Sequence, residues 1–351
     1  MLLYLHIPFC DSKCSYCAFN SYTHLHTLRK DYMAAITKQL EADLKRFSIA
    51  KKSIKTIFIG GGTPSTVDAN LYKPFFDIVW PYLEENAEIT TEANPNSATK
   101  EWLTGMKDLG INRISFGTQS FDDAKLKFLN RAHSGEETKI AVQNAFDLGI
   151  ENLSIDLIYA TLMDTKELLQ EDLKQAFELP INHLSAYALI IEEGTAFFKT
   201  PEVAKEIVED TKWFIESIKD KGFKQYEISN FGTYESEHNK GYWNYEPYLG
   251  IGAGAVGCVN NARYYPFSDV QAYIDSPLEF TEELLTGEDI KSEKILLAMR
   301  SCVGFDKSLL NIEEAKRLEI LLNEKKLIYR DGKVYNEDYM LADELALFLL
   351  Q

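Results

Sequence analysis

The sequence predicts an α/β protein, a partial TIM-like (β/α)6 barrel followed by a smaller, mostly helical C-terminal domain. Short apolar runs typical of strands alternate with helical patterns through the first two-thirds of the 351 residues. Six such repeats in a row imply a parallel sheet, which right-handed crossovers curl into a barrel or part of one. From about residue 269 the pattern becomes mostly helical. Functional groups are therefore expected at the carboxyl ends of the strands.

The strands and helices of the barrel follow from the spacing of apolar residues. Strands are predicted at residues 2–7, 55–59, 88–93, 113–118, 152–159 and 183–190. Helices are predicted at residues 28–47, in a stretch ending near 83, and at 98–109, 122–129, 136–148, 165–178 and 202–221. Gly110 and Gly149 follow two of these patterns directly and would end the helices there. Residues 223–228 again resemble a strand.

The composition changes over residues 229–268, which are dense in Asn, Tyr, Gly and His and show no helical period. This segment is predicted to form loops that cover the mouth of the barrel as a lid. We therefore divide the chain into a barrel with its lid, residues 1–268, and a helical C-terminal domain, residues 269–351. The boundary lies loosely between 265 and 290. Within that domain, residues 327–335 predict a hairpin around an Asp331-Gly332 turn.

Composition and charge exclude several function classes. The residues are 45% hydrophobic and 26% charged, as in an ordinary soluble protein, and no apolar run is long enough for a membrane span. A formal net charge of −17 argues against a nucleic-acid backbone or an anionic membrane as the main partner. The N-terminus does not show the succession of basic, apolar and small residues that is typical of a signal peptide. The odd number of cysteines suits a reducing compartment, so a cytoplasmic location is predicted.

Three of the five cysteines, Cys10, Cys14 and Cys17, lie within eight positions directly after the first predicted strand. Thiolates at this C-x-x-x-C-x-x-C spacing can each bind one iron of a 4Fe-4S cube and leave the fourth iron open. Two alternatives are a zinc loop with His6 as the fourth ligand and three reduced structural cysteines. Zinc sites usually come as two halves, and no second half is present. The remaining two, Cys258 and Cys302, are predicted to be buried small hydrophobic residues.

A glycine run, Gly60-Gly61-Gly62-Thr63-Pro64, follows the second predicted strand. Three glycines let the backbone approach a ligand closely, although a plain tight turn is the common alternative. A phosphate-binding loop is excluded because no Gly-Lys-Ser/Thr follows.

Polar residues occur at strand ends where an apolar wall would be expected, namely Glu92, Asn94, Gln119 and Asp156. Asp156 stands between Ile155 and Leu157, so its burial requires a charge partner or a hydrogen-bonded ligand. Arg131 is a candidate partner, and a purely structural ion pair between the two is the alternative.

Taken together, these motifs resemble the radical S-adenosylmethionine superfamily, and within it the branch shared by oxygen-independent coproporphyrinogen oxidase and HemW-like heme chaperones. The resemblance covers nearly the whole chain and is weakest in the C-terminal quarter. It is carried by the cysteine loop with its preceding His6-Ile7-Pro8-Phe9, the glycine run, Glu92 with Asn94-Pro95, and residues 113–121, 154–157 and 183–187.

The resemblance implies cofactors and site residues. Cys10, Cys14 and Cys17 would ligate a 4Fe-4S cluster, whose open iron takes the amino and carboxylate groups of S-adenosylmethionine; reductive cleavage of its sulfonium would give methionine and a 5'-deoxyadenosyl radical. Positions that hold this cofactor in the family are matched by Tyr4, Gly61, Gly62, Thr63, Glu92, Gln119, Arg131 and Asp156, with a backbone contact from Ala188.

Two places separate the chaperone from the oxidase. The oxidase resemblance would require a further cysteine two positions after Cys17, where this chain has Phe19. His238-Asn239-Lys240-Gly241-Tyr242-Trp243 matches the H-N-x-x-Y-W motif associated with heme binding in HemW-like proteins. His238 could ligate heme iron while Tyr242 and Trp243 pack on the porphyrin, or all three could be scaffold residues. The chain departs from the family after Tyr159, where Ala160-Thr161-Leu162-Met163-Asp164 replaces Gly-Leu-Pro-Gly-Gln.

The resulting prediction is a heme chaperone that binds a 4Fe-4S cluster, S-adenosylmethionine and heme, and delivers heme to a hemoprotein, with a membrane respiratory hemoprotein as the candidate recipient. The alternative is an oxygen-independent coproporphyrinogen III oxidase or another radical enzyme acting on a tetrapyrrole. A third hypothesis, a binding protein without a cluster, predicts that Cys14→Ala leaves the iron content unchanged.

Overall fold

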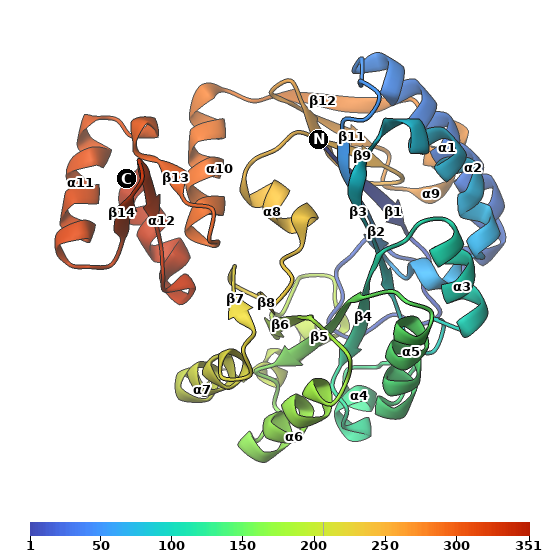
Figure 1. Ribbon diagram of the computed structural model, residues 1–351, viewed down its shortest axis with the longest axis horizontal. Helices are drawn as coiled ribbons and strands as arrows, with labels where there is room; N and C mark the ends of the chain where they lie inside the picture. Colours follow the sequence, from blue (N-terminus) through green and yellow to red (C-terminus); the bar gives the residue numbers. More distant parts are fainter. Residues whose placement is uncertain (206) are drawn as a thin grey trace.

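A single curved sheet organises the computed structural model, which describes residues 1–205 and 207–351 (Figure 1). Its strand order is β12-β11-β10-β9-β1-β2-β3-β4-β5-β6-β8-β7. Strands β1 to β6 pair in parallel with their neighbours in chain order, as predicted. Their bounds are Leu2–Ile7, Ile54–Gly61, Leu83–Ala93, Arg113–Gln119, Asn152–Tyr159 and His183–Ala188.

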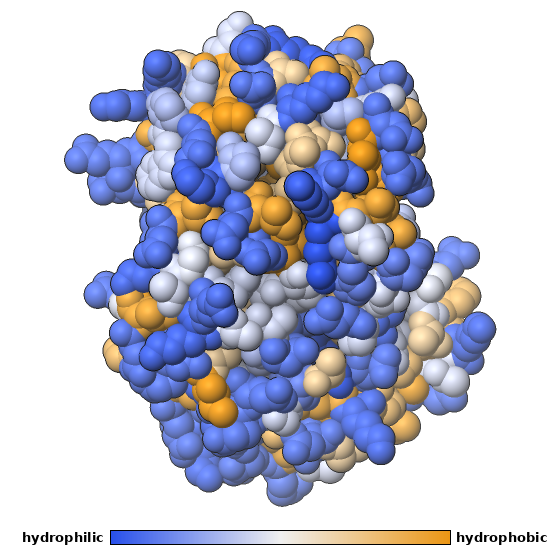
Figure 2. Space-filling view, turned by 90° about the vertical axis from the view of Figure 1, so that its right-hand side faces the viewer, coloured by the Kyte–Doolittle hydropathy of each residue, from blue (hydrophilic) through white to orange (hydrophobic). Residues whose placement is uncertain are grey.

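Helices cover the convex face of this sheet (Figure 1). They are α1 (Arg29–Arg46), α2 (Ala69–Val79), α3 (Lys100–Asp108), α4 (Asp123–Phe128), α5 (Gly135–Asp147), α6 (Lys166–Phe177) and α7 (Val208–Lys219). Side chains alternate along each strand, so Ile57 and Ile155 lie in the apolar core under these helices, whereas Thr56 and Asp156 lie on the other face. Hydrophilic residues dominate the outer surface on the side of α1 to α3, with apolar residues in scattered patches (Figure 2).

The barrel is open, as the sequence predicts. Beyond β6, the sheet continues antiparallel into β8 (Asn230–Gly232) and β7 (Lys224–Gln225), and beyond β1 it continues parallel into β9 (Tyr248–Ile251). Strand β7 is shorter than the strand predicted at 223–228. Helix α7 begins at Val208 after a short 3-10 turn, Pro201–Val203, and part of the helix predicted at 202–221 falls on residue 206, which lies outside the described residues.

The prediction of lid loops over residues 229–268 is wrong. This segment forms β8, helix α8 (Glu237–Trp243), β9, β10 (Gly257–Val259) and β11 (Ala262–Pro266). Strand β9 extends the sheet through its pairing with β1, and α8 packs against β2 on the concave side. Each of these elements is only three to seven residues long, so the sequence shows no clear period and the partner strand determines the structure.

The division between the two bodies lies in the later part of the predicted range of 265 to 290. Helix α9 (Val270–Asp275) and strand β12 (Phe280–Leu284) belong to the first body, because Val270 and Tyr273 lie in its core and β12 pairs with β11. A separate apolar core begins in α10 (Gly287–Met299), so the boundary falls near residue 285, within the predicted range although later than the division at 268.

The C-terminal body contains α10, α11 (Ile312–Asn323) and α12 (Ala342–Leu350) beside a small sheet of β13 (Phe305–Asp306), β15 (Lys333–Tyr335) and β14 (Ile328–Arg330). The predicted hairpin is confirmed: Asp331 and Gly332 both have positive φ, 52° and 84°, as a type I′ turn requires. Among the helices that the structure describes, none is long and apolar enough to cross a membrane.

Candidate cofactor site

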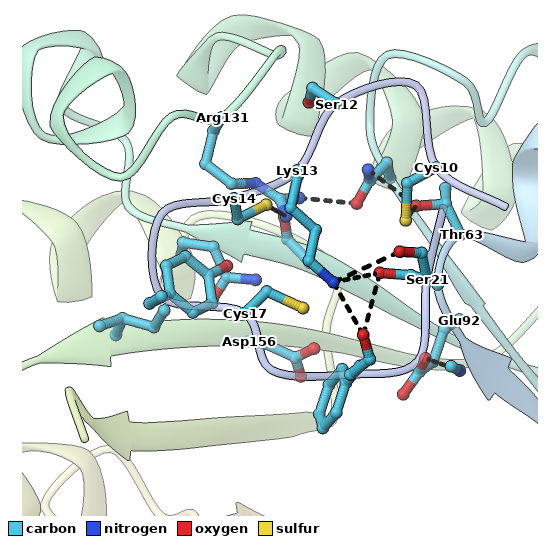
Figure 3. Close-up of a pocket in the computed structure, with 18 of the residues that line it drawn as sticks. Cys10, Ser12, Lys13, Cys14, Cys17, Ser21, Thr63, Glu92, Arg131 and Asp156 are labelled. Carbon is cyan, nitrogen blue, oxygen red and sulfur yellow. Dashed lines mark hydrogen bonds between the residues drawn. The ribbon is translucent and has the colours of Figure 1, made fainter. Parts of the chain in front are cut away.

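The three clustered cysteines lie on the rim of a cavity of about 290 Å³ at the carboxyl ends of the parallel strands. They come from one loop that follows β1, and their side chains surround a common space (Figure 3). Thiols are free at all three positions. The barrel therefore brings together the loop and the strand ends that the sequence analysis singled out separately.

Hydrogen bonds to sulfur hold two of the thiols toward this cavity. The Thr63 hydroxyl donates to the Cys10 Sγ at 3.3 Å, and the Arg131 guanidinium donates to the Cys14 Sγ at 3.3 Å. On the same loop, the Lys13 Nζ donates to the Phe19 carbonyl and to the Ser21 hydroxyl, both at 2.8 Å (Figure 3). These contacts fix the path of the loop around its sulfur atoms.

The zinc alternative does not fit this arrangement. His6 has no free ring nitrogen, because Nδ1 bonds the Tyr4 hydroxyl at 2.9 Å and Nε2 bonds the Asn20 carbonyl at 2.9 Å. Within residues 1–205 and 207–351, no three His, Cys, Asp or Glu side chains are close enough to share a single metal ion. A cube is different, since each thiolate binds its own iron and the sulfur atoms stay apart. The donor set therefore fits an iron-sulfur cluster.

The glycine run is explained first by the approach of the backbone to the cysteine loop. The Gly62 and Thr63 amides donate to the Ile7 and Phe9 carbonyls at 2.7 and 2.8 Å. A Cβ on Gly62 would lie 2.8 Å from the Ile7 carbonyl oxygen, and one on Gly61, whose φ is +112°, would lie 2.4 Å from the His6 ring. Gly61 and Gly62 also line the cavity, so the same close backbone approach forms part of its wall.

Two carboxyl groups face the cavity from neighbouring strands, Glu92 of β3 and Asp156 of β5 (Figure 3). Burial raises the pKa of Glu92 to about 8, and the charge of Asp156 adds to this shift, while the Gly61 amide donates to Glu92 Oε2 at 3.1 Å. Burial also raises the pKa of Asp156, and the Ser115 hydroxyl donates to it at 3.0 Å. Two carboxyl groups that are costly to ionise suit a cationic ligand such as an ammonium or sulfonium group.

Arg131 is not the ion-pair partner of Asp156 that the sequence suggested. Its guanidinium donates to the Asn94 side chain and to the Gly117 carbonyl, both at 2.6 Å, in addition to Cys14. The structural ion-pair alternative is therefore also wrong. Arg131 instead joins the cysteine loop to the ends of β3 and β4 and keeps a cation at the cavity wall, where a carboxylate ligand would pair with it.

Most of the predicted cofactor residues line this cavity together: Gly61, Gly62, Thr63, Glu92, Gln119, Arg131, Asp156 and Ala188, with the three cysteines. Gln119 ends β4 with a φ of 65°, a conformation that is strained for a residue with a side chain. Tyr4 lies apart from the cavity lining, with its hydroxyl on His6. The predicted set omitted Asn94, although its place directly after a strand was the available signal, and also Lys13 and Tyr187.

The loop at residues 160–164, where the chain departs from the family, keeps a backbone conformation that favours glycine at its first position. Ala160 has a φ of 60°, a conformation that glycine adopts without strain. Asp164 accepts the Thr161 amide at 2.7 Å and pairs with the buried Lys125 ammonium at 2.6 Å. The altered loop is thus held by a buried ion pair and stays part of the barrel rim.

The H-N-x-x-Y-W residues lie away from the cysteine cavity. His238 is 1% exposed, its Nδ1 bonds the Thr56 hydroxyl at 2.7 Å, and burial lowers its pKa to about 3. The carboxylate of Glu88, which sequence reasoning missed, accepts the backbone amides of Glu237 and His238 at 2.9 and 3.0 Å and so anchors α8 to β3. Axial ligation by His238 stays a prediction: its Nε2 is buried and has no hydrogen-bond partner among the described residues.

Comparison with known proteins gives the family. Residues 4–176 match the model of the radical SAM superfamily. The heme chaperone HemW of Bacillus subtilis is 32% identical over 87% of this chain and 84% of its own length, and that of Mycobacterium tuberculosis is 30% identical over 99% and 94%. The chain belongs to the HemW family of radical SAM proteins. Another member, from Escherichia coli, is 38% identical over 73% of this chain and 70% of its own length.

A solved structure confirms the fold of this family member. Coproporphyrinogen III oxidase (HemN) from Escherichia coli, a radical SAM enzyme, superposes with a TM-score of 0.83 over 99% of this chain and 89% of its own, at 19% identity. The predicted radical SAM barrel with its C-terminal domain is therefore confirmed. Family membership implies a 4Fe-4S cluster and S-adenosylmethionine, and the free thiols, buried carboxyl groups and Arg131 described above fit both.

Proposed function

We propose that this protein is a heme chaperone that holds a 4Fe-4S cluster on Cys10, Cys14 and Cys17 together with S-adenosylmethionine, binds heme, and passes it to a hemoprotein. The observation that carries this proposal is the similarity to HemW proteins over most of the chain, since the relatives are named heme chaperones. Phe19, in the position where the oxidase resemblance requires a cysteine, supports it. We place the protein in the cytoplasm and propose a respiratory membrane hemoprotein as the recipient.

The cavity residues have distinct roles toward the cofactors under this proposal. The three thiolates would bind three irons, and the open iron would take the amino and carboxylate groups of S-adenosylmethionine, which when bound supplies a cleavable sulfonium. Arg131 offers a cation to the carboxylate, and Glu92 and Asp156 offer carboxylates to the cationic groups. Gly61 and Gly62 at the cavity wall would let the backbone approach the cofactor closely.

The experiment is anaerobic reconstitution with iron and sulfide, followed by parallel assays of heme uptake and coproporphyrinogen turnover. We expect about four irons per chain for a full cluster, stoichiometric heme uptake, and no protoporphyrinogen. Introducing Phe19→Cys tests whether that position alone limits oxidase chemistry, and we expect this variant to remain inactive on coproporphyrinogen. Formation of protoporphyrinogen by the unaltered protein would establish the oxidase alternative instead.

A further inference from the structure

A second, larger cavity lies between the barrel and the C-terminal body. Its volume is about 700 Å³, within the range of sites for small organic ligands, compared with about 290 Å³ beside the cysteines. Residues of α8, of strands β9 to β11 and of α10 line it. Tyr248 on its wall pairs with Leu2 at the start of β1, whereas the cysteine loop follows the end of β1. The two cavities therefore lie at opposite ends of this strand.

Aromatic rings form one wall of this second cavity. Tyr242 and Trp243, the last two residues of α8, line it together with Tyr245 and Tyr248. The rings of Tyr242 and Tyr248 meet edge to face, with centroids 4.8 Å apart. Ile290, Leu296 and Leu297 of α10 contribute an aliphatic wall. Such walls suit a large, flat, apolar ligand that can pack against rings and methyl groups.

Two cations lie among these apolar walls. Arg263 of β11 is paired with Glu293 of α10, and the Lys294 ammonium lies 5.4 Å from the centre of the Tyr245 ring. The Tyr245 hydroxyl donates to the other Glu293 oxygen at 2.6 Å. Arg263 also lies 3.7 Å from a carboxylate oxygen of Glu283. A guanidinium has five N–H donors, so Arg263 keeps donors for a further carboxylate beside Glu293 and Glu283. A flat ligand that carries carboxylates at one edge would match this distribution of rings and cations.

One thiol belongs to the same cavity. Cys258 of β10 lines this cavity and pairs with Tyr248 of β9. The sequence predicted that Cys258 is buried, whereas the structure shows it half-buried. Burial raises its pKa, and the charge of Arg263 acts against that shift. Thiolate is an established ligand of heme iron. His238, by contrast, faces Thr56 of β2 and does not line the cavity.

We propose that heme binds in this cavity, with Cys258 as an axial ligand, Tyr242 and Trp243 against the porphyrin, and Arg263 and Lys294 toward the propionates. This proposal rests on the proposed function, since it names the heme site of the chaperone. When ligation occurs, a bond forms between iron and sulfur, the S–H bond breaks, and its proton passes to solvent, so that the oxidation state of iron does not change. Within the H-N-x-x-Y-W motif, His238 then serves as a positioning residue that holds α8, and Tyr242 and Trp243 contact the ligand.

The experiment titrates hemin into the reconstituted full-length protein and into three variants, followed by absorption spectroscopy. Cys258→Ala removes the proposed ligand, and we expect a shifted Soret band and an affinity at least about tenfold weaker, the loss of one strong interaction. Leu297→Trp fills the cavity, and we expect saturable heme binding to be lost. Cys302→Ala is the matched control, because Cys302 is also half-buried but does not line the cavity, and its spectrum and affinity should be unchanged.

The outcomes separate the site from the function. If the unaltered protein takes up no heme, the proposed function fails together with the site. If the unaltered protein binds heme and Cys258→Ala binds it with the same Soret band and affinity, the assignment of the site is wrong while the chaperone function stands. Thermal unfolding of each variant checks its fold; should Leu297→Trp unfold, the comparison of Cys258→Ala with Cys302→Ala decides alone.

Discussion

The two cavities of this molecule differ in how they are built. The cysteine cavity is small, and its polar groups come from consecutive strand ends of one barrel. The cavity beside α8 is larger and aromatic, and it requires residues between 242 and 297 from both bodies. A short sequence motif therefore predicts the cysteine cavity, whereas the cavity beside α8 becomes visible only in the folded structure. This difference agrees with our proposal that the cluster and heme occupy separate sites.

Removing a cluster ligand should have the largest effect and should act on one cavity alone. Cys14→Ala leaves two thiolates in the loop, so we expect the iron content and the visible absorption of the reconstituted cluster to fall to background. Heme affinity should change less than about twofold, because the second cavity contains no part of the cysteine loop. Iron analysis and a hemin titration on the same sample check both parts. Loss of heme binding together with the cluster would indicate one shared site.

Gly62→Ala should destabilise the cysteine cavity from its backbone side. The new Cβ would lie 2.8 and 2.9 Å from the Ile7 and Phe9 carbonyl oxygens and 3.1 Å from the Cys10 Sγ. We expect a loss of about 3 kcal/mol in unfolding free energy and incomplete cluster assembly. Gly287→Ala is the control, since nothing lies within 4 Å of its Cβ position and α10 starts there. Equal stability of the two variants in urea would show that the loop moves freely.

His238→Ala should weaken the support of the second cavity. The substitution removes a fully buried imidazole and its hydrogen bond to Thr56, so we expect about 2–4 kcal/mol lower unfolding free energy. If Cys258 is the ligand, the remaining folded protein should bind heme more weakly with an unshifted Soret band. His238→Gln, which keeps a polar group near Thr56, should recover part of the affinity. A Soret shift in His238→Ala but not in Cys258→Ala would make His238 the axial ligand.

The smallest effect concerns the charge of the cysteine cavity and has a defined sign. Glu92 has a folded-state pKa of about 8, above its ordinary value near 4.5. The contribution of the protonated Glu92 carboxyl to the unfolding free energy is therefore fully present below about pH 4.5. It is lost as pH rises through about 8, where the folded state must ionise a buried carboxyl. Without cofactors, Glu92→Gln should be about 1–2 kcal/mol more stable than the unaltered protein at pH 8.5 and equal to it at pH 4.5.

Urea unfolding at the two pH values measures this difference. Glu193→Gln, at an exposed loop position, is the control and should show no such pH dependence. The same stability difference at both pH values would contradict the assignment of the effect to ionisation of Glu92.

The sequence predicted the parallel core and most of the cysteine cavity because both rest on local patterns. Strands β1 to β6 contain short apolar runs that alternate with helical patterns, and Cys10, Cys14 and Cys17 lie close enough together in the sequence to indicate a cluster. It failed over residues 229–268, where β9 depends on pairing with β1 and no period is visible in a few residues. The sequence also suggested Arg131 as the charge partner of Asp156, because the two side chains have opposite charges. In the structure the Arg131 guanidinium donates hydrogen bonds to Asn94 and to the Gly117 carbonyl. The second cavity was not predictable, since Cys258 and Leu297 meet only across two bodies.

The most direct test of two separate sites is a hemin titration of the reconstituted protein with and without saturating S-adenosylmethionine. The six residues of β1 span about 17 Å between the two cavities, so neither ligand should exclude the other. We predict heme dissociation constants within about twofold of each other under the two conditions, the agreement expected of independent sites. Displacement of heme by S-adenosylmethionine, seen as a competitive rise in the heme dissociation constant, would contradict two separate sites and place both ligands in the cysteine cavity.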